Sequence, residues 1–254
     1  MAFNSAMNDT FFFYSMLTLT FIAAGLVKGV TGMGLPTVAM ALLGTAMPLS
    51  AAAALLVIPS FVTNAWQFFS GPAANRLLGR LWPMQLAVVA GTVSGAGLMV
   101  TINPIWSGFA LGTALVIYAA YALFAPPVLV SPSNERWLSP VVGAVTGVVT
   151  GATGVFVMPA VPYLQALQLE KDELVQALGL SFTVSTLALA AGLLLHGGLK
   201  LDQLGLSALA IFPALVGMFI GRLIRARISA QRFRKCFLAF LMVLGVELVS
   251  RAFI

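Results

Sequence analysis

Long apolar runs separated by short polar joints cover almost the whole chain. A helix that crosses the hydrocarbon core of a membrane needs about 20 mainly apolar residues. About seven or eight of the apolar segments reach that length. The pattern therefore predicts an all-α integral membrane protein, a polytopic helical bundle, with apolar segments at 11–31, 35–47, 50–69, 82–101, 104–125, 139–157, 159–168, 173–195, 203–223 and 233–253.

Two of these segments, 35–47 and 159–168, are shorter than a membrane crossing. They have about 10 to 13 residues, whereas a crossing needs about 17 to 25. Each follows a glycine-rich stretch, and glycine weakens helical continuity because it loses the most conformational freedom on folding. We expect both segments to be half-helices or re-entrant pieces.

The glycine-rich stretches reveal an internal repeat. The stretch "GLVKGVTGMGLP" ends at Pro36, and the stretch "GAVTGVVTGATGVFVMP" ends at Pro159. In each copy a short apolar piece and a predicted helix start follow, with Ser50 and Asp172 as the capping side chains. The glycines that precede the two prolines at similar spacing are Gly25, Gly29, Gly32 and Gly34, and Gly143, Gly147, Gly151 and Gly154. The sequence thus predicts a first transmembrane repeat at 1–125, a cytoplasmic linker at 126–138 and a second transmembrane repeat at 139–254.

Composition excludes a soluble globular domain. Apolar residues make up 60% of the chain and charged residues 8%, and the mean hydropathy is +1.03. The lone cysteine, Cys236, excludes an intramolecular disulfide scaffold. We attribute the net charge of +6 to membrane topology and not to nucleic-acid binding.

Basic residues predict the orientation of the chain, because cytoplasmic loops carry the excess of lysine and arginine. If the four basic loops all face the cytoplasm, both termini lie outside and the two repeats run in opposite directions. The regions 11–48 and 139–171 then each begin and end on one side of the membrane. The basic residues of those loops are Arg76, Arg80, Arg136, Lys171, Arg222, Arg225, Arg227, Arg232, Arg234 and Lys235.

The glycines admit two interpretations. Small residues four positions apart let membrane helices approach closely without any ligand. Alternatively, they break the helices, and Pro36 and Pro159 then fit the first turn of a new half-helix. Freed backbone groups at membrane depth must face protein or water, and exposed amides at a helix N-terminus attract anions. Paired interrupted segments of this kind form the substrate site in many secondary transporters.

On these two glycine blocks, their duplication and the chain length, the sequence resembles the TauE/SafE family, also called the sulfite exporter family. The resemblance covers essentially the whole chain. It implies transport of small sulfur-containing anions, such as sulfite, sulfoacetate and related organosulfonates, across the bacterial inner membrane. It implies a multi-pass membrane protein without enzymatic activity or a cofactor.

Lys28 is the strongest candidate for substrate binding. Placing a charged side chain inside a membrane costs free energy, so such a residue marks a functional site by default. It could also snorkel to the interface, and Thr146 occupies the matching place in the second repeat. Asn64 and Gln67 are three positions apart and share a helix face, although hydroxyls and amides there could equally bond between helices. The predicted substrate-binding residues are Lys28, Gly29, Gly32, Gly34, Pro36, Asn64, Gln67, Gly151, Thr153, Gly154, Pro159, Ser181 and Ser185.

The sequence predicts a secondary transporter that works by alternating access, with export as the expected direction. It contains no phosphate-binding P-loop, so the expected driving force is a proton gradient or the membrane potential. His196, or Glu247 with Arg251 four positions on, could serve proton coupling; an ordinary i, i+4 pair is the simpler interpretation of the latter two. The expected partners are the lipid bilayer and a small anion. Whether the protein also forms a homodimer is left open by the sequence. The alternatives are an accessory or structural membrane subunit, a transporter of another small organic anion, and an intramembrane enzyme. The enzyme is disfavoured because a single histidine provides neither a two-histidine metal site nor a Ser/His pair placed within a membrane segment.

Overall fold

The computed structural model describes the backbone of residues 2–126, 128–227 and 229–253. Within these residues every regular element is a helix, which confirms the predicted all-α class for this part of the chain. The helices are α1 (Ala2–Thr31), α2 (Leu35–Leu43), α3 (Leu49–Phe69), α4 (Ala74–Thr101), α5 (Pro104–Phe124), α6 (Pro132–Thr153), α7 (Ala160–Ala166), α8 (Lys171–Leu195), α9 (Leu201–Leu209), α10 (Ile211–Arg225) and α11 (Ala230–Ser250).

The protein is a multi-pass membrane protein by the length and composition of its helices. Six described segments are long and apolar enough to cross a membrane: Phe11–Thr31, Leu49–Phe69, Ala74–Thr101, Pro104–Phe124, Lys171–Leu195 and Gln203–Arg225. Helices α6 and α11 also reach crossing length, with 22 and 21 residues. They are less apolar, because glycines and threonines fill α6 and charged residues crowd the first turns of α11.

Some predicted boundaries differ from the structure. Helix α6 begins at Pro132, inside the predicted linker, since proline suits the first turn of a helix. The predicted segment 203–223 is divided into α9 and α10 at Ala210. The predicted caps Ser50 and Asp172 are wrong: the residues that precede α3 and α8 are Pro48 and Glu170, without a side-chain capping bond.

The two short segments are short helices. Helix α2 has 9 residues and α7 has 7, too few to cross a membrane. Pro36 lies in the first turn of α2, and Pro159 directly precedes α7. Both prolines thus sit where a helix can start without losing a backbone hydrogen bond.

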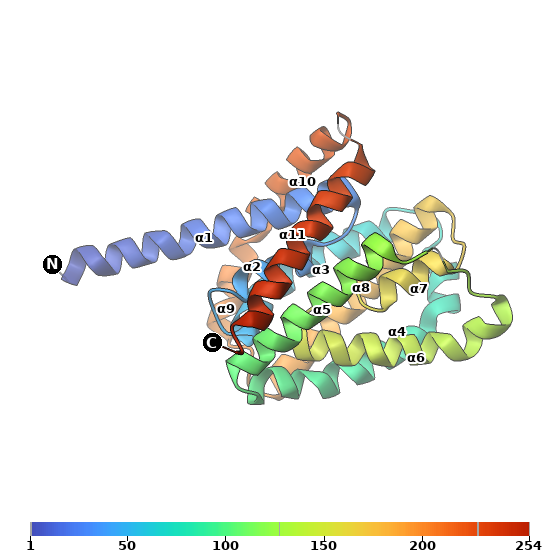
Figure 1. Cartoon of the computed structure of the whole chain (residues 1–254), viewed down its shortest axis with the longest axis horizontal. Coiled ribbons are helices and arrows are strands. Elements are labelled where there is room, and N and C mark those ends of the chain that lie inside the picture. The colour runs from blue at the N-terminus through green and yellow to red at the C-terminus, as the bar shows by residue number, and fades with distance from the viewer. Residues whose placement is uncertain (1, 127, 228, 254) are drawn as a thin grey trace.

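The long helices pack in five main pairs. Helix α1 packs along α10, α6 along α4, α5 against α11, and α8 against both α3 and α4. Helix α2 lies between α1 and α3, and α7 lies against α6 and α8. The N-terminal part of α1 extends beyond the rest of the bundle (Figure 1).

The loops that carry the predicted cytoplasmic charges meet at one end of the bundle, which we call the basic end. There the Ala73 N–H donates to the Gln176 side chain of α8, and the Val130 N–H donates to the Ala166 carbonyl of α7. At the other end, which we call the opposite end, Arg251 contacts the turn that follows α2. Helix α1 runs to the basic end and α2 runs back, whereas α6 runs to the opposite end and α7 runs back.

Candidate functional site

The chain breaks in the same way after α1 and after α6. The breaks are at Thr31–Met33 and Thr153–Val155, and in each the threonine ends the helix. The next residue has a left-handed backbone, with φ of 81° at Gly32 and 72° at Gly154, which glycine tolerates without strain. The N–H two residues after the threonine donates to the threonine Oγ1, at 3.3 and 3.2 Å respectively. The threonine hydroxyl therefore accepts from an N–H of the break itself.

These matched breaks define an offset in the chain, which we use as the register between its two halves. The helix ends Thr31 and Thr153 are 122 positions apart, and so are the first residues of α3 and α8, at 49 and 171. In this register Lys28 corresponds to Thr150. The sequence-based expectation pairs Lys28 with Thr146, one helical turn earlier.

Lys28 lies one turn before the first break and is buried, with 3% of its surface exposed. Its ammonium donates hydrogen bonds to Asn64 Oδ1 and to Thr63 Oγ1, the latter at 3.2 Å, both from α3. Among the described residues it is the one buried side chain that carries a charge, and no carboxylate pairs with it. Since an ammonium has three donors, one N–H of Lys28 has no hydrogen-bond partner among the described residues.

Several uncharged polar groups are buried on the helices around this lysine without a hydrogen-bond partner among the described residues. Asn64 accepts from Lys28 through Oδ1, while its Nδ2 is unpaired. Ser60 lies one turn before Asn64 on α3, a spacing that places both on one helix face. The other unpaired hydroxyls on neighbouring short and central helices are those of Thr37, Ser181 and Ser185. Buried polar groups are normally satisfied, so the unpaired groups of Asn64 and Ser60 are available to a polar ligand beside Lys28. Gln85, Thr92 and Thr146, on α4 and α6, also have buried polar atoms without a partner among the described residues.

The structure joins the second break to the first short helix. An added Cβ on Gly154 would lie 2.8 to 3.0 Å from side-chain atoms of Met40, on α2. On the other side, Gly34 has a φ of 99° and contacts Val27 in the last turn of α1. Both broken regions therefore contact α2, although they come from different halves of the chain.

Three of the predicted binding residues lie in other surroundings. Gly29 packs against the α10 backbone at Met218, and Gly151 packs against the α4 backbone at Thr92. Gln67 donates at 2.8 Å to the carbonyl of Val175, in the first turns of α8, and so does not share a partner with Asn64. The structure thus supports the packing interpretation for Gly29 and Gly151 and the break interpretation for Gly32, Gly34 and Gly154.

A pocket of about 210 Å³ adjoins the end of α1 at the basic end of the bundle. Its lining includes Val30, Thr31 and Met33 from the end of α1 and the first break, together with Arg225 and Arg234. These arginines make no ion pair among the described residues. The pocket therefore places two arginines beside the last turn of α1.

The remaining candidates for proton coupling have ordinary partners. Glu247 and Arg251 form the predicted i, i+4 ion pair, with 2.5 Å between Oε1 and Nε. His196 ends α8, and its Nδ1 lies 2.8 Å from the Gly192 carbonyl oxygen.

Sequence reasoning missed two parts of this site. Ser60 could have been found from its spacing to Asn64, and Thr37 from its place directly after Pro36. The approach of Met40 to Gly154 had no signal in the sequence, because it joins residues from different halves of the chain.

Comparisons with known proteins agree with the resemblance. Residues 17–248 match the family described as Sulfite exporter TauE/SafE. No curated protein and no solved structure matches the chain. Since the match covers nearly the whole chain, all the long helices and both breaks included, the protein belongs to the TauE/SafE family of sulfite exporter-type membrane transporters.

Proposed function

We propose that the protein is a secondary transporter that exports small sulfur-containing anions, such as sulfite, sulfoacetate or related organosulfonates, across the bacterial inner membrane. Binding takes place at Lys28, Asn64 and Thr63, with the buried hydroxyls nearby. The two short helices, α2 and α7, flank this site from opposite ends of the bundle. Access alternates between the two ends.

The observation that carries the proposal is the buried ammonium of Lys28 without a carboxylate partner. A buried charge is costly unless it is paired and hydrogen-bonded. Lys28 has two neutral oxygen partners, so a bound anion supplies the missing opposite charge. The unpaired Asn64 Nδ2 and the hydroxyl of Ser60 are hydrogen-bond donors suited to the oxygen atoms of such an anion.

The arrangement of the helices supports alternating access. With the 122-residue register, α1 and α6 are counterparts, as are α3 and α8. The packing of α1 on α10 then corresponds to the packing of α6 on α4, and α3 and α8 pack on each other. Because α1 runs to the basic end and α6 runs to the opposite end, we propose that the two halves form inverted repeats, the arrangement in which many transporters expose a central site to each side in turn. The positive-inside rule places the basic end in the cytoplasm.

A panel of anions tests the function. Purified protein is expected to be stabilised by sulfite and by sulfonates more than by sulfate, phosphate or acetate at equal concentration, because a ligand that binds the native state raises the melting temperature. Reconstituted liposomes are expected to take up labelled sulfite or sulfoacetate only when they contain the protein. Equal stabilisation by all five anion types would reject the sulfur assignment. Absence of flux for every anion would favour an accessory or structural subunit.

A further inference from the structure

An arginine from elsewhere in the chain contacts the backbone just after each short helix. At the basic end, Arg80 of α4 donates to the carbonyl of Leu167, the residue directly after α7, at 3.5 Å. At the opposite end, Arg251 donates to the carbonyl of Thr45, just after α2, at 2.8 Å. Carbonyls at a helix C-terminus lack partners within the helix, and cationic side chains satisfy them.

Each of these arginines is also paired with a glutamate. Arg80 makes a two-bond pair with Glu135 of α6, at 2.7 and 2.8 Å, and Arg251 pairs with Glu247. We call Arg80 with Glu135 the basic-end clamp, and Arg251 with Glu247 the opposite-end clamp. The guanidinium has five donors in a fixed plane, so it can hold a carboxylate and a carbonyl together.

The two clamps hold equivalent points of the fold. Thr45 and Leu167 are 122 positions apart, the same register that relates the two breaks. The arginines themselves are not copies of one another, since one comes from the beginning of α4 and the other follows α11. The corresponding backbone carbonyl after each short helix is thus bound by an arginine from an unrelated part of the chain. This indicates that fixing the C-terminal end of the short helix is important in both halves.

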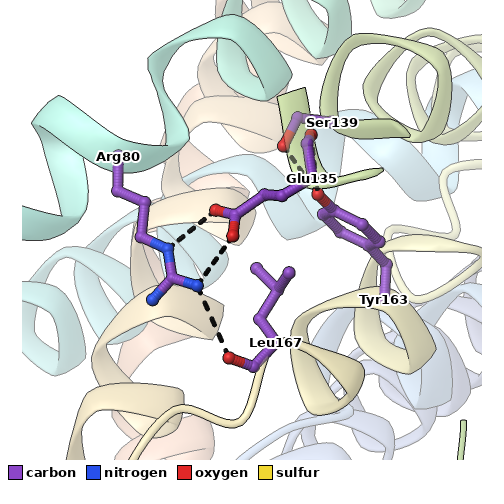
Figure 2. A network of polar contacts seen from close by, with 5 residues as sticks. All are labelled: Arg80, Glu135, Ser139, Tyr163 and Leu167. Atoms are coloured by element: carbon purple, nitrogen blue, oxygen red, sulfur yellow. Dashed lines mark hydrogen bonds and ion pairs between the residues drawn. The ribbon is translucent and has the colours of Figure 1, made fainter. Parts of the chain in front are cut away.

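The basic-end clamp is the more extensive of the two (Figure 2). Tyr163, on α7, hydrogen-bonds through its hydroxyl to Ser139 of α6 at 2.7 Å and donates to the Glu135 carbonyl at 3.4 Å. The clamp and this tyrosine therefore tie α7 to α4 and α6. The side chains of the basic-end clamp are also less exposed. Arg80 and Glu135 are 38% and 14% exposed, whereas Arg251 and Glu247 are 50% and 40% exposed.

We infer that Arg80 and Arg251 are positioning residues of the transport cycle: each holds the short helix at its own end of the bundle against the binding site, and release of one clamp opens that end. This inference builds on the alternating access proposed above. It assigns the opening of each end of the bundle to a separate ion pair. Loss of the basic-end clamp favours the state open to the cytoplasm, and loss of the opposite-end clamp favours the state open to the outside.

Sided chemical labelling tests this assignment without any transported anion. A single reporter cysteine replaces Ser60, which is buried beside Asn64, in a background in which Cys236 is replaced by serine. A membrane-impermeant thiol reagent is applied from either side of oriented vesicles. We expect Arg80→Gln to raise the ratio of basic-end to opposite-end labelling rates about threefold or more, and Arg251→Gln to lower it by a similar factor, since a bias of even ~0.65 kcal/mol changes a two-state ratio threefold.

Arg76 supplies the matched control. It also lies near the start of α4 and pairs with a glutamate, Glu173 of α8, but makes no contact with a carbonyl of α7. Arg76→Gln is expected to leave the labelling ratio unchanged. If Arg80→Gln does not fold, Arg80→Lys keeps the charge but loses the planar fork, and it is expected to shift the ratio in the same direction.

Opposite shifts for the two clamps support the inference whether or not sulfite is the transported anion. Unchanged ratios, or equal acceleration of labelling from both sides in both variants, would overturn it and leave both arginines as structural caps. A failure of the anion panel with opposite shifts intact would instead reject the proposed substrate alone.

Discussion

Replacing Lys28 by methionine is expected to reduce sulfite or sulfonate flux by about tenfold or more. Hydrogen bonds to charged groups contribute about 1.5–3 kcal/mol, and each ~1.4 kcal/mol is a factor of ten in binding. Methionine keeps an unbranched apolar stem of similar length but provides neither charge nor donor. The variant is expected to lose the stabilisation by sulfite in the thermal assay as well as the flux in proteoliposomes.

The matched control is Lys200→Met, which removes the same charge from an exposed position directly before α9. This variant is expected to keep wild-type flux. The Lys28 variant is expected to remain folded, because the loss of a costly buried charge offsets the loss of its hydrogen bonds to Asn64 and Thr63. Flux within twofold of wild type in a folded Lys28→Met protein would contradict the assignment of Lys28 to substrate binding.

The periodic and compositional signals in the sequence were sufficient to predict most of the helices. Apolar runs of crossing length predicted the long helices, and the short runs that follow the glycine blocks predicted α2 and α7. The start of α6 and the division at Ala210 were missed, since polar residues at Ser133–Arg136 hide the first turns of α6 and the apolar pattern continues through Ala210. Helix boundaries depend on local backbone bonds that hydropathy does not detect.

The candidate site could be predicted in part. A lysine inside an apolar run is visible in the sequence, and so is the polar cluster around Asn64. The partner of Lys28 was not predictable from spacing, because Lys28 and Asn64 lie on different helices, α1 and α3, and are 36 positions apart in the chain. The same holds for Arg80 and Glu135, which are 55 positions apart.

Glycine presented the hardest ambiguity, since one spacing pattern served two purposes within a single stretch. Gly25 and Gly29 pack against α10, whereas Gly32 and Gly34, in the same block, have positive φ at the break. Residue identity alone does not separate the two roles. The separation depends on whether another helix backbone lies beside the glycine or whether its own backbone is left-handed.

Gly25→Val is expected to destabilise the protein strongly. An added Cβ on Gly25 would lie 2.1 Å from the carbonyl oxygen of Ala214 on α10, and the obstacle is backbone, which cannot rotate away. Overpacking of a tight contact costs about 1–3 kcal/mol and occasionally more, and the upper part of that range applies here. A loss of ~3 kcal/mol corresponds to a fall of about 6–12 °C in melting temperature for a chain of this size.

The comparison that isolates this contact is Gly79→Val, in α4, because an added Cβ there would meet no heavy atom within 4 Å. That variant is expected to unfold at the wild-type temperature or slightly above, since valine has a better helix propensity than glycine. Gly147 lies 122 positions after Gly25. Gly147→Val would place its Cβ 2.5 Å from the Val88 carbonyl oxygen and is expected to behave like Gly25→Val. Thermal unfolding of the three purified variants in detergent decides the question: equal melting temperatures for all three would show that the α1–α10 and α6–α4 contacts can widen without cost, and the tight packing inferred for these glycines would then be wrong.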